Sequence, residues 1–327
     1  MKILVRLPNW LGDMVMSTGF LQALRTVYPG AEVDVIVKKG LESLIDFMPG
    51  INHHYIFSRD EWKGLTGVYR FGRKIRQEKK YDLFFCLPDS FSSACMAWAT
   101  GVAERIGFKK ELRSLLLTRS FTRPASLHRA EEYISLLQQF SNKNITAQPV
   151  VLKAKTTAIA NRIIINFNSE AVSRRMPVDK AASVLTALIK QLPGKEIVCI
   201  GSMKEKEHID AILKKINDPA VVVNKSGKTG SLPELIELIA SGSAMLTTDS
   251  GPAHIGNALG VPVVVLFGAG NEKNTAPYNK EPLTVLRLGQ LPCEPCVKNT
   301  CIYGLPKCLE LLDENKIVQS VQKFVAL

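Results

Sequence analysis

The sequence lacks any apolar run approaching the ~18 residues that a membrane-spanning helix needs. We also expect no secretory leader, because the apolar stretch at the N-terminus is interrupted by Arg6 and no cleavage region follows it. We therefore expect a cytoplasmic protein. In that compartment the seven cysteines are expected to be reduced.

Acidic residues are few relative to basic ones. The chain has 30 Asp and Glu against 42 Lys and Arg, and its net charge of +12 indicates an anionic partner. The excess lies in the N-terminal half, where residues 59–80 hold eight cations against three acids and residues 104–129 hold seven against two. No aromatic-interleaved basic groove of the single-strand-binding kind is evident, so nucleic acid is disfavoured. A merely solvated basic face is the alternative reading.

The two common nucleotide-binding signatures are incomplete. Residues 227–229 (GKT) resemble the end of a P-loop, but Val222 stands where its leading glycine belongs. Residues 268–270 (GAG) resemble a dinucleotide fingerprint, but Lys273 occupies the position of the third glycine. The sequence therefore gives little support to a kinase or a dehydrogenase function.

The cysteines do not have the usual spacing of a structural zinc site, which is two separated CxxC pairs. Cys293 and Cys296 form one such pair, and Cys301 and Cys308 follow singly. Reduced structural cysteines in an irregular loop fit this spacing better than zinc ligands. We expect no metal site.

What is present indicates two α/β domains. A hydrophobic content of 46% is typical of a globular protein, and 327 residues suit two domains. Short β-rich runs alternate with helical patterns in both halves, on either side of a polar passage at residues 141–161. This pattern predicts two doubly wound, parallel-sheet (Rossmann-like) domains facing across a cleft. We place them at residues 1–155 and 156–312, followed by a helix within 313–327.

Residues 247–262 (TTDSGPAHIGNALGVP) are the most informative segment. They read as a strand end, a tight turn at residues 249–251, and a short helix over 253–259 with Pro252 in its first turn. Backbone N–H groups at such a helix start bind phosphate, and His254 adds an imidazole donor suited to a diphosphate. The alternative is an ordinary turn in which Asp249 or Ser250 caps the helix.

A second candidate site follows the first predicted strand, at residues 7–13 (LPNWLGD). Gly12 permits close approach of a ligand to the backbone. Asp13 lies at a helix start, whose dipole stabilises its charged form, so the carboxylate is available as a general base. The alternative is that Asp13 only caps the helix.

Two further candidates lie at strand ends of the second half. Glu205 follows a predicted strand, where a carboxylate can accept hydrogen bonds from ribose hydroxyls. Arg174 and Arg175 offer guanidinium groups to a diphosphate. A helix-start acid and a solvated pair of cations are the respective alternatives.

Four segments carry a family resemblance: residues 7–13 (LPNWLGD), 81–91 (YDLFFCLPDSF), 227–254 with its GKT, LPEL and DSGPAH runs, and 293–308 with its cysteines. Through these segments the chain resembles the family-9 glycosyltransferases, whose best known members are ADP-heptose:lipopolysaccharide heptosyltransferases. The cysteine cluster is similar to one common in the heptosyltransferase II branch.

The resemblance implies a GT-B architecture, with an acceptor-binding N-terminal domain, a donor-binding C-terminal domain and a last helix packing back on the N-terminal domain. It implies an inverting transfer of heptose from ADP-L-glycero-D-manno-heptose to the lipopolysaccharide inner core. No cofactor is required, and the use of Mg²⁺ stays open. Alternatives are a family-9 transferase using another nucleotide sugar or glycan acceptor, and a non-catalytic nucleotide-sugar-binding protein.

The resemblance also implies roles for particular residues, with Asp13 as the base that deprotonates the acceptor hydroxyl. Asp249 would contact the transferred sugar and Glu205 the ribose. The groups implied to hold the phosphates are Arg174, Ser250, Gly251 and His254. The candidates on the acceptor side are Asn9, Gly12 and Ser90. The basic segments would meet anionic groups of the acceptor and of the inner leaflet, which makes the protein peripheral to the cytoplasmic membrane.

One departure from the family pattern concerns residues 174–177 (RRMP), where the family has a run like Lys-Arg-Trp-Pro. Arg174 differs from lysine in reach and geometry, and Met176 replaces a large packing residue. The identity of the donor sugar therefore stays open.

Overall fold

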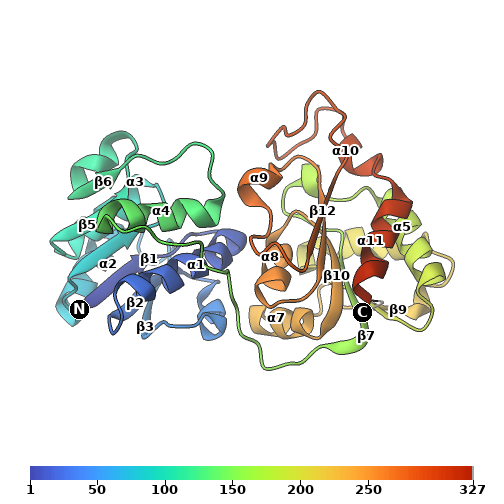
Figure 1. The fold of residues 1–327 in the computed structure, drawn as a ribbon, viewed down its shortest axis with the longest axis horizontal. Coiled ribbons are helices and arrows are strands. Elements are labelled where there is room, and N and C mark those ends of the chain that lie inside the picture. The colour runs from blue at the N-terminus through green and yellow to red at the C-terminus, as the bar shows by residue number, and fades with distance from the viewer. Residues whose placement is uncertain (326–327) are drawn as a thin grey trace. The chain divides into compact units, whose positions relative to one another are not determined.

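The computed structural model describes residues 1–325, which form two compact units (Figure 1). Along the chain, the boundary between the units lies between Leu152 and Lys153. This boundary lies close to the predicted one after residue 155. Each unit is a six-stranded, fully parallel sheet with helices against it. The predicted pair of doubly wound α/β domains is confirmed.

The N-terminal sheet has the strand order β3-β2-β1-β4-β5-β6. Its strands are β1 (Lys2–Arg6), β2 (Glu32–Lys38), β3 (His53–Phe57), β4 (Leu83–Cys86), β5 (Glu104–Phe108) and β6 (Arg119–Phe121). Its helical segments are α1 (Leu11–Val27), η1 (Glu42–Phe47), α2 (Gly64–Glu78), α3 (Phe91–Ala99), η2 (Glu111–Leu116) and α4 (Arg129–Ser141). The central strands β1 and β4 are buried on both faces, as continuous apolar runs in parallel sheets usually are.

The C-terminal sheet has the order β12-β11-β10-β7-β8-β9. Its strands are β7 (Ile159–Asn166), β8 (Glu196–Cys199), β9 (Val222–Asn224), β10 (Gly242–Thr248), β11 (Val263–Phe267) and β12 (Leu283–Arg287). Its α-helices are α5 (Val178–Gln191), α6 (Lys206–Leu213), α7 (Leu232–Ala240), α8 (Gly251–Ala258), α9 (Glu272–Thr275), α10 (Lys307–Glu310) and α11 (Glu314–Val325). Its 3-10 turns are η3 (Val172–Arg174), η4 (Met203–Glu205) and η5 (Pro219–Val221).

The same winding recurs in both domains. Counted along the chain within each domain, both sheets have the order 3-2-1-4-5-6, which reverses direction between the first and fourth strands. Ligands of such folds bind outside the carboxyl ends of the strands at this switch point. The topology therefore selects the loops after β1 and β4 in one domain, and after β7 and β10 in the other.

The last helix packs within the C-terminal domain. Figure 1 shows α11 beside α5, and its apolar residues Ile317, Val318 and Val321 belong to the core of the C-terminal domain. The predicted packing of this helix on the N-terminal domain stays a prediction. The apolar residues of this amphipathic helix are buried within the C-terminal domain itself.

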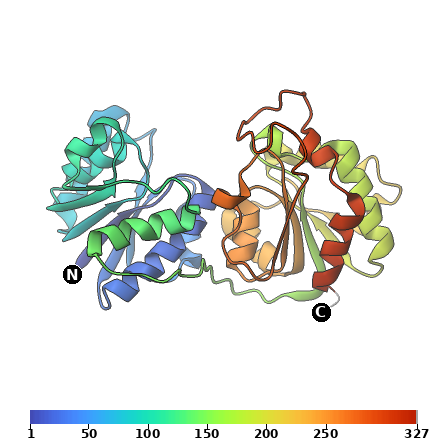
Figure 2. The same ribbon diagram turned by 45° about the horizontal axis from the view of Figure 1, so that its top comes forward.

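The segment before the boundary belongs to the N-terminal domain. The Val151 N–H donates to the hydroxyl of Thr18 (3.0 Å), and the Gln22 amide donates to the carbonyl of Pro149 (2.7 Å). Figure 2 shows α4 lying along α1, against which it packs. No helix among residues 1–325 combines the length and apolarity that a bilayer crossing requires.

Candidate functional site

The N-terminus of α8, which follows β10 at the switch point, is not closed by a side-chain cap. Ser250 is the N-cap residue, but its hydroxyl makes no capping hydrogen bond. It instead donates to the carbonyl of Thr248 (3.1 Å) and accepts from the amide of Asn166 (2.9 Å). The helix starts at Gly251, two residues before the predicted start, with Pro252 in its first turn. The positive end of the helix dipole is therefore available to an anion.

Asp249 is buried directly before this helix start. Its side chain is 4% exposed, and its Oδ2 lies 3.2 Å from Nη1 of Arg174. Burial raises the pKa of the Asp249 carboxyl to about 6, although Arg174 and Arg287 both act to lower it. The Asp249 carboxylate lies beside a helix N-terminus that can bind a diphosphate, so it can accept hydrogen bonds from the hydroxyls of an attached sugar. Asp249 is not the cap of α8, which excludes that alternative.

The close packing of Asp249 depends on Gly270. A Cβ atom at this position would lie 2.0 Å from Oδ2 of Asp249, which no side chain could tolerate. Gly270 of the GAG run at residues 268–270 therefore makes room for a buried carboxylate, whereas Gly268 packs against Cys308 and Leu309.

Sequence reasoning missed Arg287, at the end of β12. Its guanidinium donates to the carbonyls of Gly268 (3.0 Å) and Gly270 and pairs with Glu272 (2.6 Å). It fixes the loop that surrounds Asp249 and contributes positive charge there. The sequence signal was weak, since nothing near Arg287 in the chain marks its partners.

Sequence reasoning also missed the polar residues at the end of β7 and after it. The Asn166 amide reaches Ser250, the Thr248 hydroxyl donates to the carbonyl of Asn168 (2.5 Å), and Ser169 donates to the carbonyl of Asp249 (3.4 Å). These bonds join the two loops of the switch point. Asn166 is the last residue of this buried strand, and Asn168 and Ser169 follow Phe167; polar residues at a strand end were a signal that sequence analysis could have used.

His254 and Glu205 have local positions that leave their predicted roles untested. His254 is buried in α8, one turn from Ser250. Glu205 accepts a hydrogen bond from the Ser202 N–H (2.8 Å) and completes a capping box at η4. The helix-start alternative for Glu205 is therefore realised, and the contact of its second oxygen with a ribose stays a prediction.

The segment that departs from the family pattern is well anchored. Arg175 donates to the carbonyl of Ser169 (3.2 Å), and Met176 is completely buried in the domain core. Met176 is therefore a core residue of this domain. Only Arg174 of the pair reaches Asp249.

Arg174→Gln should raise the pKa of Asp249 further, above the wild-type value of about 6, because Arg174 is the larger of the two cationic influences on that carboxyl. Carboxyl titration by NMR on isotope-labelled protein measures this directly. Arg175→Gln is the matched control, since Arg175 contacts Ser169 rather than Asp249. An equal Asp249 pKa in the two variants would contradict the assignment.

The loop at residues 293–308, which bears four cysteines, is hydrogen-bonded to segments near Asp249 and Arg174. The Val297 N–H donates to the carbonyl of Ala269 (2.8 Å), and the Ser173 N–H donates to that of Asn299 (3.1 Å). All seven cysteines are free thiols, and Cys308 is buried. Among residues 1–325, no three His, Cys, Asp or Glu side chains are arranged to hold a metal ion.

In the N-terminal domain, Asp13 lies in the first turn of α1, directly after β1. Its Oδ1 is 3.6 Å from Nε of Arg129, which begins α4. Burial raises the pKa of Asp13 despite the attraction of Arg129 and Arg123, and the nearby Asp89 adds to the rise. This corrects the expectation that the helix start favours the charged form. The raised pKa makes Asp13 a stronger base than an exposed aspartate.

Arg129 and Arg123 connect Asp13 to two further acids. Arg129 pairs with Glu132 at 2.8 Å, and Arg123 pairs with Asp89, which follows β4 at the switch point. Five charged side chains from three parts of the chain thus surround one sheet edge. Sequence reasoning identified only Asp13 among them.

The remaining acceptor-side candidates differ in what holds them. The Asn9 side chain accepts a hydrogen bond from the buried guanidinium of Arg6 (2.5 Å). Gly12 is the second residue of α1. Ser90 caps α3 by accepting from the Ser93 N–H (3.2 Å), so its hydroxyl has a structural partner. Any contact of these residues with an acceptor stays a prediction.

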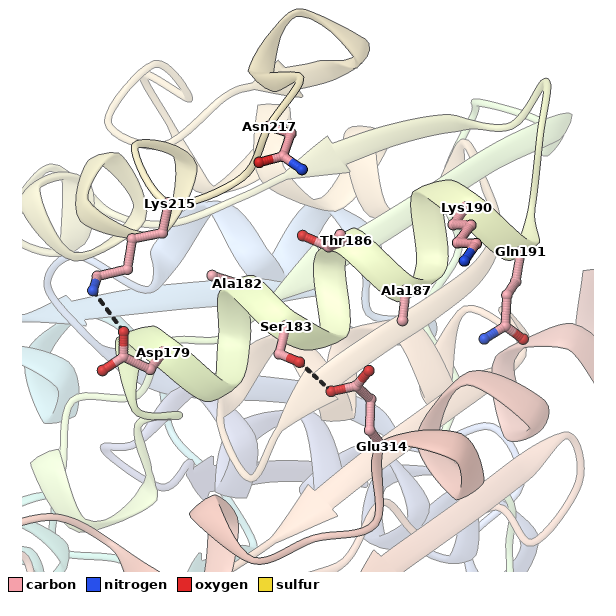
Figure 3. A pocket seen from close by; sticks show the side chains of 10 residues that line it. All are labelled: Asp179, Ala182, Ser183, Thr186, Ala187, Lys190, Gln191, Lys215, Asn217 and Glu314. Carbon is pink, nitrogen blue, oxygen red and sulfur yellow. Dashed lines mark hydrogen bonds and ion pairs between the residues drawn. The ribbon is translucent and has the colours of Figure 1, made fainter.

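The surface also carries a depression of about 660 Å³ between α5 and the start of α11 (Figure 3). Lys215 pairs there with Asp179 (2.6 Å), and Ser183 donates to Glu314. None of the candidate site residues lines it. We assign it no role.

These two doubly wound domains, each with polar side chains gathered at its switch point, have the GT-B architecture. The sequence pattern of glycosyltransferase family 9 (heptosyltransferase) matches residues 68–306. The chain is 30% identical to lipopolysaccharide heptosyltransferase 2 of Escherichia coli (strain K12) over 312 residues, 88% of each chain. It is 28% identical to lipooligosaccharide heptosyltransferase 2 of Haemophilus ducreyi over 359 aligned positions, covering both chains completely.

The solved structure of E. coli ADP-heptose lipopolysaccharide heptosyltransferase II superposes with a TM-score of 0.82 at 25% identity, covering 100% of this chain and 99% of that one. The chain belongs to glycosyltransferase family 9. The resemblance read from its motifs is confirmed.

Proposed function

We propose that this protein is an inverting heptosyltransferase that moves heptose from ADP-L-glycero-D-manno-heptose to the inner core of lipopolysaccharide. The observation that carries the proposal is the uncapped start of α8 beside the buried Asp249–Arg174 pair. The relatives named heptosyltransferase 2 support the choice of sugar and acceptor.

On the donor side, we assign the diphosphate to the α8 N-terminus and Arg174. The helix start supplies backbone donors at Gly251 together with Ser250 and His254, and Arg174 supplies a guanidinium suited to phosphate oxygens. Asp249 accepts hydrogen bonds from hydroxyls of the transferred sugar. Glu205 takes the ribose with the carboxylate oxygen that its capping box leaves free.

On the acceptor side, Asp13 acts as the general base. Its carboxylate removes the proton of the acceptor hydroxyl as that oxygen bonds to the anomeric carbon, and the bond from this carbon to the diphosphate oxygen breaks. ADP leaves with the electron pair, and the single displacement inverts the anomeric configuration. Asn9 and Gly12 line the approach to this base. Arg129 opposes the rise in the pKa of Asp13 that burial causes.

We propose that the leaving group needs no metal. The negative charge that develops on ADP meets fixed positive groups, Arg174 and the helix dipole, and such preorganised groups can supply the electrostatic stabilisation of a transition state. Mg²⁺ can bind the free nucleotide without entering this scheme.

The basic N-terminal domain supports an anionic, membrane-embedded acceptor. Residues 59–80 and 104–129 carry its excess of positive charge, which suits inner-core phosphates and carboxylates and an anionic leaflet. We therefore place the protein at the cytoplasmic face of the inner membrane, as a peripheral protein. Nucleic acid is not a partner in this proposal beyond weak, salt-sensitive attraction.

A thermal-shift panel tests the donor assignment. A ligand that binds only the folded protein raises its melting temperature, and ADP-heptose at about a hundredfold excess over Kd should raise it by ~5 °C. ADP should give a smaller shift, and UDP-sugars none. Adding Mg²⁺ should not alter the order.

Two outcomes would redirect the proposal. Selective stabilisation by UDP-sugars favours a family-9 transferase with another donor. Stabilisation by ADP-heptose without release of ADP in the presence of a lipopolysaccharide inner-core acceptor favours a non-catalytic nucleotide-sugar-binding protein.

A further inference from the structure

The 3-10 turn η2 has an inverted pattern of burial: two of its three leucines are exposed and its arginine is buried, while the third leucine, Leu116, packs against the core. Leu112 is 68% exposed and Leu115 is 81% exposed, whereas Arg113 between them is 1% exposed. The Arg113 guanidinium donates to the carbonyls of Phe108 (2.6 Å) and Pro88 (3.1 Å). These bonds fix the turn from below and hold both leucines outward. Exposing two leucines on an ordered turn has no structural benefit in water.

Exposed apolar side chains continue from η2 onto α3 and α2. η2 packs against α3, and α3 packs against α2. Phe91 and Trp98, seven residues apart on one side of α3, are both exposed. The Trp98 ring lies 5.4 Å, centroid to centroid, from that of Tyr69 on α2. With Leu65, one turn before Tyr69, these residues and the two leucines form what we call the α2–η2 face.

Charges around the α2–η2 face are mostly positive. α3 carries no charged residue. Exposed cations flank the apolar residues: Lys63 precedes α2, Arg73 lies one turn after Tyr69, and Lys109 and Lys110 precede η2. Of the nearby acids, Glu78 is 3.8 Å from Lys74, and Glu111 is exposed.

We propose that the α2–η2 face binds the surface of an anionic lipid bilayer. The leucines and Phe91 enter the headgroup–acyl boundary, and the Tyr69–Trp98 pair lies at the level where such rings concentrate in membrane proteins. The lysines reach the anionic headgroups while their stems cover apolar surface. A protein partner fits less well, because lysine is depleted in protein–protein interfaces.

This inference rests on the proposed function and specifies how it operates. η2 follows the carboxyl end of β5 and Phe91 follows that of β4, so both lie at the sheet edge that also holds Asp13. Binding through this face brings the base toward the membrane, where a lipid-anchored acceptor presents its sugars. The acceptor then does not have to leave the bilayer.

Sedimentation with vesicles tests the surface directly. Leu112→Gln combined with Leu115→Gln should lower partitioning onto vesicles of phosphatidylcholine and phosphatidylglycerol by about tenfold or more. The matched control is Ile302→Gln with Leu305→Gln, which removes two equally apolar, exposed side chains from the C-terminal domain. The control should partition like the wild type. All these positions are exposed, so melting temperatures should not change.

A second pair of substitutions tests the contribution of the lysines to vesicle binding. Lys109→Gln with Lys110→Gln should weaken partitioning about thirtyfold on vesicles that contain phosphatidylglycerol and leave it unchanged on pure phosphatidylcholine. Unaltered partitioning of the Leu112/Leu115 variant, or an equal loss in the Ile302/Leu305 control, would overturn the proposal and leave the face to a protein partner.

Activity separates this inference from the proposed function. On a deacylated, water-soluble acceptor, the Leu112/Leu115 variant should retain wild-type turnover, and on acceptor in vesicles it should lose turnover in step with its partitioning. A wild-type protein that transfers to neither acceptor refutes the proposed function, whereas the vesicle measurements still decide the surface.

Discussion

Asp13→Asn should lower turnover by about 10²–10⁴-fold, the range that a positioned general base contributes. Asparagine has nearly the shape of aspartate but cannot take up the acceptor proton. Its neutral amide also removes the charge that faces Arg129. Only the ionised form of Asp13 can act as a base, and burial raises the pKa of this carboxyl. As the pH is lowered, the wild-type rate should therefore begin to fall at a pH above the ordinary pKa of an aspartate.

ADP affinity should be unchanged in the Asp13→Asn variant, since every residue assigned to the donor belongs to the C-terminal domain. Steady-state kinetics and calorimetric ADP binding give the two readouts. Asp46→Asn, at an exposed position of the same domain, is the control for charge loss alone. Turnover near the wild-type level in Asp13→Asn would remove Asp13 from the mechanism.

The fold was predictable because parallel strands buried on both faces leave continuous apolar runs in the sequence. The β-rich runs of residues 32–38, 263–267 and 283–287 predict strands with these bounds, and β2, β11 and β12 have them. β6 was missed because it has only three residues, two of them Arg119 and Ser120, and owes its place to pairing with β5. The helical pattern of residues 204–216 predicts one helix, but the structure has η4 followed by α6, and the capping box of Ser202 and Glu205 closes the first turn.

The candidate site was predictable only where a residue lies in the loop or the first helical turn that follows a strand. Asp13 and Asp249 were found in this way, and their raised pKa values come from burial that no local pattern reveals. Arg129 and Arg287 reach these carboxyls from distant parts of the chain, so the sequence could not indicate them. The predicted cleft between the domains and the ligand contacts stay predictions.

Asp249→Asn should have opposite effects on stability and on catalysis. Burial raises the pKa of this carboxyl from 3.8 to about 6, so at neutral pH the folded protein holds an ionised group that its surroundings disfavour. A neutral asparagine avoids that penalty, and the free energy of unfolding of the ligand-free protein should rise by about 1–3 kcal/mol at neutral pH. Turnover should fall by about a hundredfold or more, because a charged acceptor for the sugar hydroxyls is lost.

The dependence on pH fixes the sign of the stability effect. Between the ordinary pKa of aspartate and about 6, the folded protein holds more protons on Asp249 than the unfolded chain does. The free energy of unfolding of the wild type should therefore fall as the pH rises through this window, whereas that of the variant should lack this contribution. Urea unfolding below and above the window measures the difference, with the exposed Asp218→Asn as control in the same domain.

The same experiment distinguishes a functional carboxylate from a structural one. If Asp249 served chiefly as the partner of Arg174, its replacement would leave a part-buried guanidinium without its counter-charge and would destabilise the protein. A gain in stability with a loss of turnover is instead the behaviour of a group held in an unfavourable state for the sake of its ligand. A destabilised variant with unchanged donor affinity would assign Asp249 to the scaffold and leave the sugar contact to another residue.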